Sequence, residues 1–162
     1  MRRLLSNGLA VVAGVVSLPV CGSHAAATKP PSAEHRTEPF KDPRLGFLRV
    51  FFAQSHSPIL ELAPVFLEAA DAHGLDWRLL PSLSFVESSA GKSAKNNNLF
   101  GWDSGRAAFS SATACIHSVA ASLKNSAIYR HKDLDGILRT YNRSLGYARR
   151  VKDVMRRIAP AA

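Results

Sequence analysis

The sequence predicts an all-α domain, and three observations lead to this fold class. From Pro58 to Ile158, apolar side chains recur at spacings of three and four residues, the period of an amphipathic helix. Residues suited to helix ends, such as Gly74 and Asp133, separate these segments. No run of alternating apolar and polar residues indicates a strand. We therefore expect, at most, a short irregular or hairpin segment between Lys92 and Phe109.

The first 26 residues have the layout of a secretory signal peptide. Arg2 and Arg3 precede an apolar run from Leu4 to Val20, and small residues follow. This order predicts cleavage near residues 25–27 and export to the periplasm or the medium. The apolar run is shorter than the roughly 20 uninterrupted residues of a membrane span. An uncleaved N-terminal anchor is the alternative, so membrane contact is expected only through this segment.

The composition of residues 27–45 predicts a disordered linker, because a segment of prolines and mixed charges has few apolar side chains to bury. Residues 46–160 match the usual size of one domain. Lipidation of Cys21 is disfavoured, since lipoprotein signals carry a small residue where this chain has Val20. If Cys21 leaves with the signal peptide, Cys115 has no disulfide partner. It lies in an apolar helical stretch and is expected to be a small buried side chain.

The helical pattern begins near Leu48, and five later segments follow in order. Gly74 is a natural stop for the first of them. Asp76 can cap the second, in which Pro81 is tolerated only within the first turn. Ser110 or Ser111 can cap the third, and Asp133 opens the fourth. The segments are Pro58–His73, about Leu80–Gly91, Ser111–Lys124, Asp133–Tyr141 and Tyr147–Ile158.

Glu87 lies on the apolar side of its predicted helix. On a helical wheel it falls between Leu83 and Leu80, inside the apolar arc. Burying a carboxylate is costly, and desolvation favours the protonated form of a carboxyl group. A glutamic acid that keeps its proton can donate it to a leaving oxygen, as glycoside cleavage requires. The alternative is a glutamate at the rim of the core, hydrogen-bonded to nearby backbone.

The residues that follow Glu87 carry a family resemblance. Phe85–Ser93 (FVESSAGKS) and Asn97–Trp102 (NNLFGW) resemble the glucosaminidase family of bacterial cell-wall hydrolases, which carry Glu-Ser-x-x-Gly-Lys-Ser and then Asn-Asn-Leu-Phe-Gly. Leu79-Leu80-Pro81 leading to Glu87-Ser88 also resembles the lytic transglycosylases of the lysozyme superfamily. Thr140-Tyr141-Asn142 is similar to their Tyr-Asn motif. The resemblance covers about residues 55–158.

This resemblance implies a lysozyme-like helical fold that cleaves β-1,4 bonds of peptidoglycan next to N-acetylglucosamine. It implies that Glu87 is the general acid and that Tyr141 orients or stabilises the reacting sugar. Flat aromatic faces suit sugar rings, amides suit N-acetyl and hydroxyl groups, and glycine allows a close backbone approach. Core packing is the alternative for the aromatic residues. The expected substrate-binding residues are Ser88, Asn97, Asn98, Phe100, Gly101, Trp102 and Asn142.

A second catalytic carboxylate is expected at Asp103, directly after Trp102. Asp133 and Asp135 are alternatives, although both look like helix-start residues. Asp103 also fits a turn, because Asp-Ser-Gly at 103–105 is a turn signal. Without a second carboxylate, the substrate's own N-acetyl group can act as the nucleophile, and the product can be hydrolysed or anhydro.

The formal net charge is +9, and many of the cations lie between Arg139 and Arg157. Such a basic face favours the binding of polyanions, and bacterial envelopes and nucleic acids are both polyanions. The alternative is a helix face that is only solvated. The export signal argues against nucleic acid. No histidine has metal-ligand spacing, and no phosphate-binding loop occurs, so we expect no cofactor. Cys115 and His117 point apart on a helix, which gives little support to a cysteine peptidase.

Together, the signal-peptide layout and the family resemblance predict an exported enzyme. Its expected partner is the glycan strand of peptidoglycan, which it would cleave. Glucosaminidase, muramidase and lytic transglycosylase activities share this scaffold and stay open. A non-catalytic glycan-binding module is the alternative from another class, although a binder has little use for a buried carboxyl group.

Overall fold

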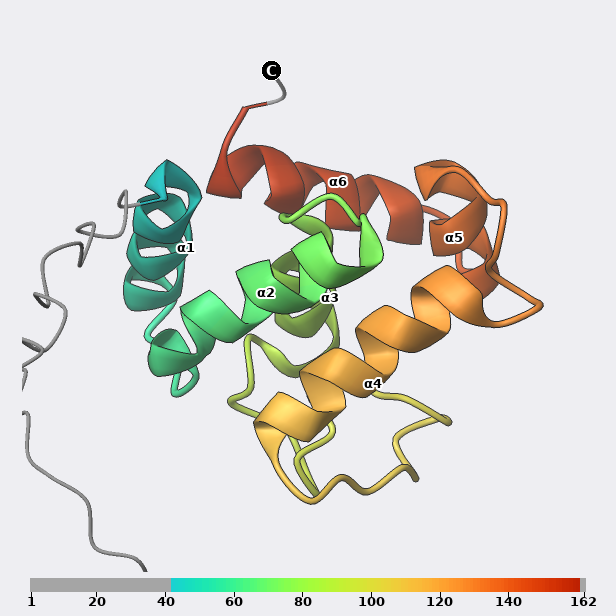
Figure 1. Ribbon diagram of the computed structural model, residues 1–162, viewed down its shortest axis with the longest axis horizontal. Coiled ribbons are helices and arrows are strands. Elements are labelled where there is room, and N and C mark those ends of the chain that lie inside the picture. Colours follow the sequence, from blue (N-terminus) through green and yellow to red (C-terminus); the bar gives the residue numbers. More distant parts are fainter. Residues whose placement is uncertain (1–41, 161–162) are drawn as a thin grey trace, which may run out of the picture. The chain divides into compact units, whose positions relative to one another are not determined.

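The structure, a computed structural model, describes residues 42–160, which form helices joined by loops (Figure 1). Within these residues there is no strand, only an isolated antiparallel bridge between Lys95 and Asn98. The predicted all-α class is confirmed for this part of the chain. The elements are α1 (Pro43–Gln54), the 3-10 helix η1 (Leu60–Leu62), α2 (Ala63–His73), α3 (Leu79–Ser88), α4 (Ala112–Asn125), α5 (Leu134–Tyr141) and α6 (Tyr147–Ile158).

The predicted signal peptide of residues 1–26, with Cys21, lies outside the described residues, as does most of the predicted linker of residues 27–45. The α1 helix starts at Pro43, so the last three residues of the predicted linker are helical and that boundary was placed too late. Proline suits the first turn of a helix, where its missing N–H costs nothing. The Asp42 side chain caps this turn by accepting a hydrogen bond from the Arg44 backbone at 2.9 Å.

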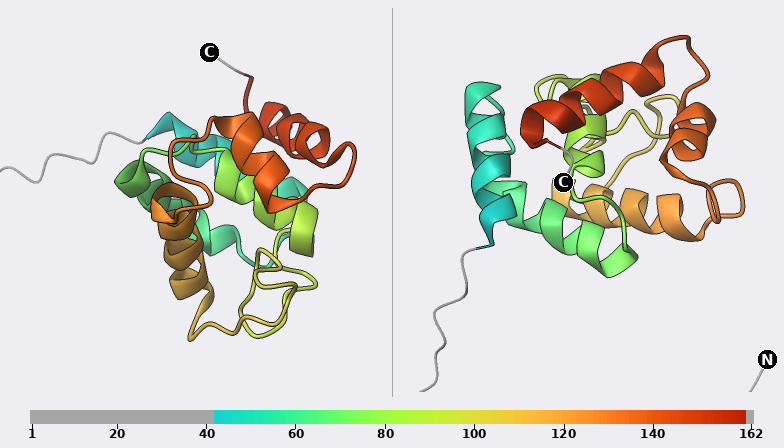
Figure 2. Two further views of the ribbon diagram at one scale, coloured as in Figure 1. Left: turned by 90° about the vertical axis from the view of Figure 1, so that its right-hand side faces the viewer. Right: turned by 90° about the horizontal axis from the view of Figure 1, so that it is seen from above.

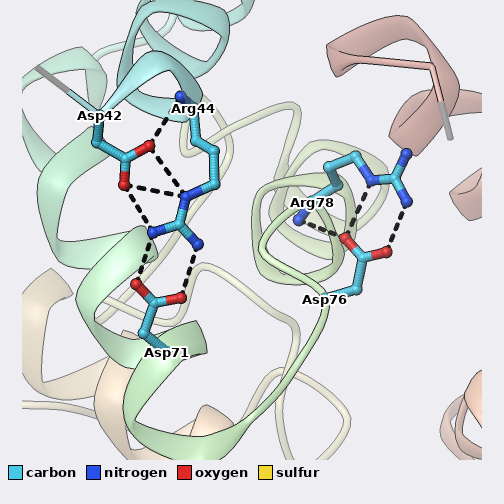
Figure 3. A network of polar contacts seen from close by, with 5 residues as sticks. All are labelled: Asp42, Arg44, Asp71, Asp76 and Arg78. Carbon is cyan, nitrogen blue, oxygen red and sulfur yellow. Dashed lines mark hydrogen bonds and ion pairs between the residues drawn. The ribbon is translucent and has the colours of Figure 1, made fainter. Parts of the chain in front are cut away.

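Ion pairs fasten two of the helix starts (Figure 3). The Arg44 guanidinium binds Asp42 and also reaches Asp71 of α2 through two bonds of 2.7 and 2.8 Å, which joins α1 to α2. Arg78 pairs with Asp76 at 2.7 Å just before α3. The same guanidinium donates to the carbonyl of Ala159, which follows α6, at 3.0 Å. The end of the described chain is thereby held against the start of α3.

Several predicted helix ends are confirmed. Gly74 ends α2 in the left-handed conformation, with φ 58°. The Ser111 hydroxyl accepts from the Ala114 N–H at 3.0 Å and caps α4. Asp133 caps α5 by accepting from the Gly136 N–H at 2.7 Å. The bounds of α6 are those predicted.

Two helices differ from the prediction. The segment from Pro58 to His73 becomes a turn, η1 and then α2, because Pro64 fits only in a first turn and forces α2 to start beside it. The α3 helix ends at Ser88 instead of near Gly91. Its successors Ser89 and Ala90 are left-handed, with φ 52° and 55°. Asp76 accepts from the Arg78 N–H in the preceding turn, and Arg78 itself is the N-cap of α3.

The core forms where α3 packs against α6 and α2 packs against α4. Its largest fully buried side chains include Phe52, Phe66, Phe100 and Tyr147. The segment between α3 and α4 is a long loop that extends along one side of the helices (Figure 2). Cys115 is buried in α4, as predicted, and burial raises the pKa of its thiol to about 11. No helix within residues 42–160 is long and apolar enough to cross a membrane.

Candidate functional site

The site begins at the C-terminal end of α3, which carries Glu87. Ser88 next to it is 3% exposed, and its hydroxyl shares one proton between the carbonyls of Ser84 at 3.0 Å and Leu99 at 2.8 Å. The same oxygen accepts from the Gly91 N–H at 3.0 Å. Ser88 therefore fastens the chain after α3 to the loop around Leu99. Because its hydroxyl is already used, its contribution to the site is to position its neighbours.

Glu87 is half-buried, and its two carboxyl oxygens have different surroundings. The Tyr147 hydroxyl of α6 donates to Oε1 at 2.6 Å. Oε2 lies beside Gly101, so close that a Cβ added there would stand 3.0 Å from it. Within residues 42–160, Oε2 has no hydrogen-bond donor and Glu87 has no ion pair. One oxygen is held in place and the other is available.

Two tyrosines build the wall behind the carboxyl group. The rings of Tyr141 and Tyr147 stack with centroids 6.0 Å apart, and the Arg150 guanidinium lies 5.7 Å from the Tyr147 centroid. Burial raises the pKa of Tyr147, and the hydrogen bond and charge of Glu87 raise it further. Burial and the Glu87 charge likewise raise the pKa of Tyr141, whose hydroxyl donates to the Phe100 carbonyl at 2.5 Å. Both hydroxyls stay protonated as donors.

Two hollows open beside this arrangement, and Gly101 borders both. The first, of about 180 Å³, is lined by Glu87 together with Ser88, Ser93, Lys95, Asn98, Gly101 and Gly105. The second, of about 150 Å³, is lined by Gly101, Trp102, Asp103, Ser104, Tyr129 and Tyr141. Glu87 thus lines one hollow, and an aromatic-lined hollow adjoins it at Gly101.

The two predicted aromatic residues of the cleft have different positions. Trp102 borders the second hollow and meets the Tyr141 ring edge-on, with centroids 5.7 Å apart. It is partly exposed and offers an apolar face. Phe100 has no exposed surface and packs against Phe66 in the core. Its side chain cannot wall a cleft, so the expectation for Phe100 is corrected to a role for its carbonyl, which receives the Tyr141 hydroxyl.

The predicted asparagines mostly build the loops. Asn98 is 4% exposed, and its amide donates to the carbonyls of Trp102 and Ala107 while its Oδ1 accepts from the Trp102 N–H. It borders the first hollow but its polar atoms are used. Asn97 donates to the Phe109 carbonyl, and Asn142 accepts from the Ser144 N–H. Neither of these two lines either hollow.

Asp103 is exposed, in a left-handed turn with φ 52°, and pairs with Arg106 at 2.7 Å. The Arg106 guanidinium holds the pKa of this carboxyl below its ordinary value. Asp103 lines the second hollow, whereas Glu87 lines the first. The alternatives have other partners, since Asp133 caps α5 and Asp135 binds Lys152 at 2.5 Å. Among the described residues that line the hollow of Glu87, none is a second carboxylate.

Tyr147 is a site residue that sequence reasoning placed only at the start of the last helix. The available signal was a tyrosine within the apolar stripe of α6, because a buried hydroxyl needs a hydrogen-bond partner. Its partner lies 60 positions away in the sequence. Comparison of the chain with known protein families, curated proteins and solved structures gives no match.

Proposed function

We propose that this chain is an exported, lysozyme-like glycosidase that cleaves β-1,4 bonds of peptidoglycan next to N-acetylglucosamine, with Glu87 as the general acid. The observation that carries the proposal is the asymmetry of the Glu87 carboxyl group. Tyr147 holds Oε1, while Oε2 lies at a hollow with no donor of its own among residues 42–160. In the acid form of Glu87, which general-acid catalysis requires, a proton on Oε2 would be placed to reach a leaving glycosidic oxygen.

Cleavage would proceed by transfer of this proton as the glycosidic bond breaks. The carbonyl oxygen of the substrate's N-acetyl group bonds to the anomeric carbon, so that no second carboxylate is needed in the hollow of Glu87. The Glu87 carboxylate then takes a proton from the group that opens the cyclic intermediate. Water as that group gives a hydrolysed end, and the sugar's own 6-hydroxyl gives an anhydro end. Asp103 lines the next hollow and is paired there with the Arg106 guanidinium at 2.7 Å, so the mechanism does not depend on its charge.

Tyr141 and Trp102 would position the sugar. The partly exposed face of Trp102 suits the apolar side of a sugar ring, and Tyr141 forms the wall between this tryptophan and Tyr147. Gly101 lies between the two hollows, where a side chain would block Oε2. These positions support a substrate that crosses Gly101 from one hollow to the other.

The proposal is tested by the loss of turbidity of purified cell walls. Glu87→Gln keeps the size of the side chain and an oxygen that accepts from Tyr147, but it has no acidic proton. A general acid contributes about 10² to 10⁴ in rate, so we expect a loss of that size. Glu68→Gln, an exposed substitution on α2, is the matched control and should keep the parent's activity. Full activity of Glu87→Gln would refute the assignment.

The bond and the product are decided by mass spectrometry of the released fragments. A reducing N-acetylglucosamine end indicates the proposed glucosaminidase. A reducing muramic acid end indicates a muramidase, and a 1,6-anhydro ring indicates a lytic transglycosylase.

A glycan-binding module without activity is the second candidate, because an aromatic face beside a polar hollow can hold a sugar without catalysis. In that case the parent would sediment with cell walls and release no fragments, and Glu87→Gln would bind as the parent does.

A further inference from the structure

A hollow of about 690 Å³ lies apart from Glu87. It is lined by residues that follow α2, by the end of α4, by the segment between α4 and α5, and by α5. Its apolar lining includes Leu79, Leu123 and Ile137, which are almost fully buried. Pockets of this size hold small molecules or a few residues of peptide.

The rim of this hollow is positively charged. Lys124, Arg130 and Lys132 line it, and none of them has an acidic partner within residues 42–160. The one carboxylate in the lining, Asp76, is already paired with Arg78 at 2.7 Å. Lys124 lies near Gly74 at the C-terminal end of α2, where a cation is favoured. Arg130 and Lys132 have no such role, so their charge is available to an anion.

The hollow adjoins the candidate site. Tyr129 lines both this hollow and the smaller one that contains Trp102 and Tyr141. The Tyr129 and Trp102 rings pack with centroids 6.2 Å apart. A branch on a sugar bound at Trp102 would therefore have a cationic, partly apolar hollow next to it.

We propose that this hollow binds the acidic peptide branches of peptidoglycan, so that the preferred substrate is glycan that still carries its peptides. This inference rests on the proposed function. The carboxylates of a branch would pair with Arg130 and Lys132 at the rim. Its methyl groups would contact Leu75 and Leu134, the half-buried leucines of the lining. A nucleic acid fits less well, because the lining is concave and aliphatic and Tyr129 is its single aromatic residue.

The first experiment compares soluble glycan strands with and without their peptide branches, using the full chain. We expect the parent to have a KM about ten-fold lower for the peptide-bearing strands, the effect of about 1.4 kcal/mol of binding free energy. The double variant Arg130→Gln/Lys132→Gln should raise this KM to that of the bare strands and leave kcat unchanged. Its parameters on bare strands should equal those of the parent.

The matched control is Arg49→Gln/Arg149→Gln, which removes two exposed cations that line none of these hollows and should change neither KM. Equal KM values of the parent for both substrates would overturn the inference and leave the proposed function intact. The inference would also be overturned if the control variant raised the KM for peptide-bearing strands as much as the double variant does, because the effect would then come from overall charge.

A second experiment does not depend on catalysis. The free tetrapeptide branch released by an amidase is titrated into Glu87→Gln while backbone amide signals are followed by NMR. Shifts confined to residues around Lys124 and Arg130–Lys132, and lost in the Arg130→Gln/Lys132→Gln background, support the inference even if the parent cleaves no glycan. Absence of these shifts, or duplex DNA shifting the same signals at a lower concentration than the peptide, overturns it.

Discussion

Gly101 and Glu87 show how a single missing side chain can keep a catalytic oxygen accessible. Gly101 is left-handed, with φ 59°, which glycine adopts without steric cost. The absent Cβ also leaves the space beside Oε2, since it would stand 3.0 Å from that oxygen. Two separate requirements, one of backbone conformation and one of space, therefore meet at this residue.

We predict that Gly101→Ala lowers activity about a hundredfold, because it displaces the Glu87 carboxyl group. The left-handed backbone should also cost about 1–2 kcal/mol of unfolding free energy. Gly74→Ala is the matched control, since Gly74 has φ 58° but its added Cβ would meet only the Lys124 ammonium at 3.7 Å. Chemical denaturation and cleavage of bare glycan strands measure the two effects. Equal activity losses in the two variants would assign the effect to backbone strain alone.

The Tyr147 hydroxyl should matter for catalysis through its bond to Glu87, which Tyr147→Phe tests. The change keeps the ring that stacks on Tyr141 but removes the hydroxyl that holds Oε1 of Glu87. We expect kcat to fall about ten-fold with KM unchanged, together with a stability loss of about 1 kcal/mol. In a Glu87→Gln background the same change should have no further effect on the residual rate, as expected for residues that act as one unit. A change of KM alone would instead indicate a substrate contact.

The shortest α-helix of the described residues, α5, starts at a side-chain cap. It spans only Leu134–Tyr141 and carries Tyr141 at its last position. The Asp133 carboxylate accepts from the Gly136 N–H at 2.7 Å and satisfies one of the free donors of the first turn. The cap therefore helps to fix the helix that brings Tyr141 beside Tyr147.

We predict that Asp133→Ala lowers the unfolding free energy by about 1 kcal/mol, whereas Asp133→Asn, which keeps the accepting oxygen, loses less than half of that. Urea denaturation measures both. If the asparagine variant were as unstable as the alanine variant, Asp133 would stabilise the protein through the charge of its carboxylate at the helix start and not through the hydrogen bond.

The helix bounds show what local patterns can and cannot predict. The predicted bounds of α6 and the capping residues of α4 and α5 agree with the structure because each depends on neighbouring residues. The end of α3 was missed because Ser89 and Ala90 are left-handed without being glycine. Tertiary bonds hold them there, among them that from Ser88 to Leu99, and no local pattern reports such bonds.

For the molecule as a whole, the packing of α3 against α6 creates the candidate site. The helical wheel placed Glu87 on the apolar side of its helix, and in the structure this side chain is half-buried and accepts a hydrogen bond from Tyr147 of α6. Its partner Tyr147 could not be predicted, because nothing in either segment specifies which helices meet. Phe100 was assigned to the cleft by its place in a motif, whereas its burial depends on contact with Phe66 of α2.

The unfolding free energy of the domain should fall as the pH rises above 9. Burial raises the pKa of Cys115 from 9.0 to about 11 and raises the pKa values of Tyr129, Tyr141 and Tyr147 above 10. Above these ordinary values the unfolded chain loses protons that the folded chain keeps, so unfolding becomes easier as pH rises. The contribution of these groups is complete below pH 9 and declines above it. Ionisation of the thiol accounts for the loss of unfolding free energy that begins near pH 9, which is on the order of 2 kcal/mol by pH 11.

Urea denaturation at a series of pH values from 7 to 11 tests this dependence. We expect a slope that begins near pH 9 in the parent and near pH 10 in Cys115→Ala, in which the three tyrosines are what remains of this set of buried groups. The alanine variant will be less stable at pH 7 because it leaves a small cavity in the core, so the comparison depends on the slopes and not on the absolute values. An identical onset in both proteins would mean that the buried thiol does not couple to unfolding, and that the tyrosines around Glu87 alone determine the alkaline limit.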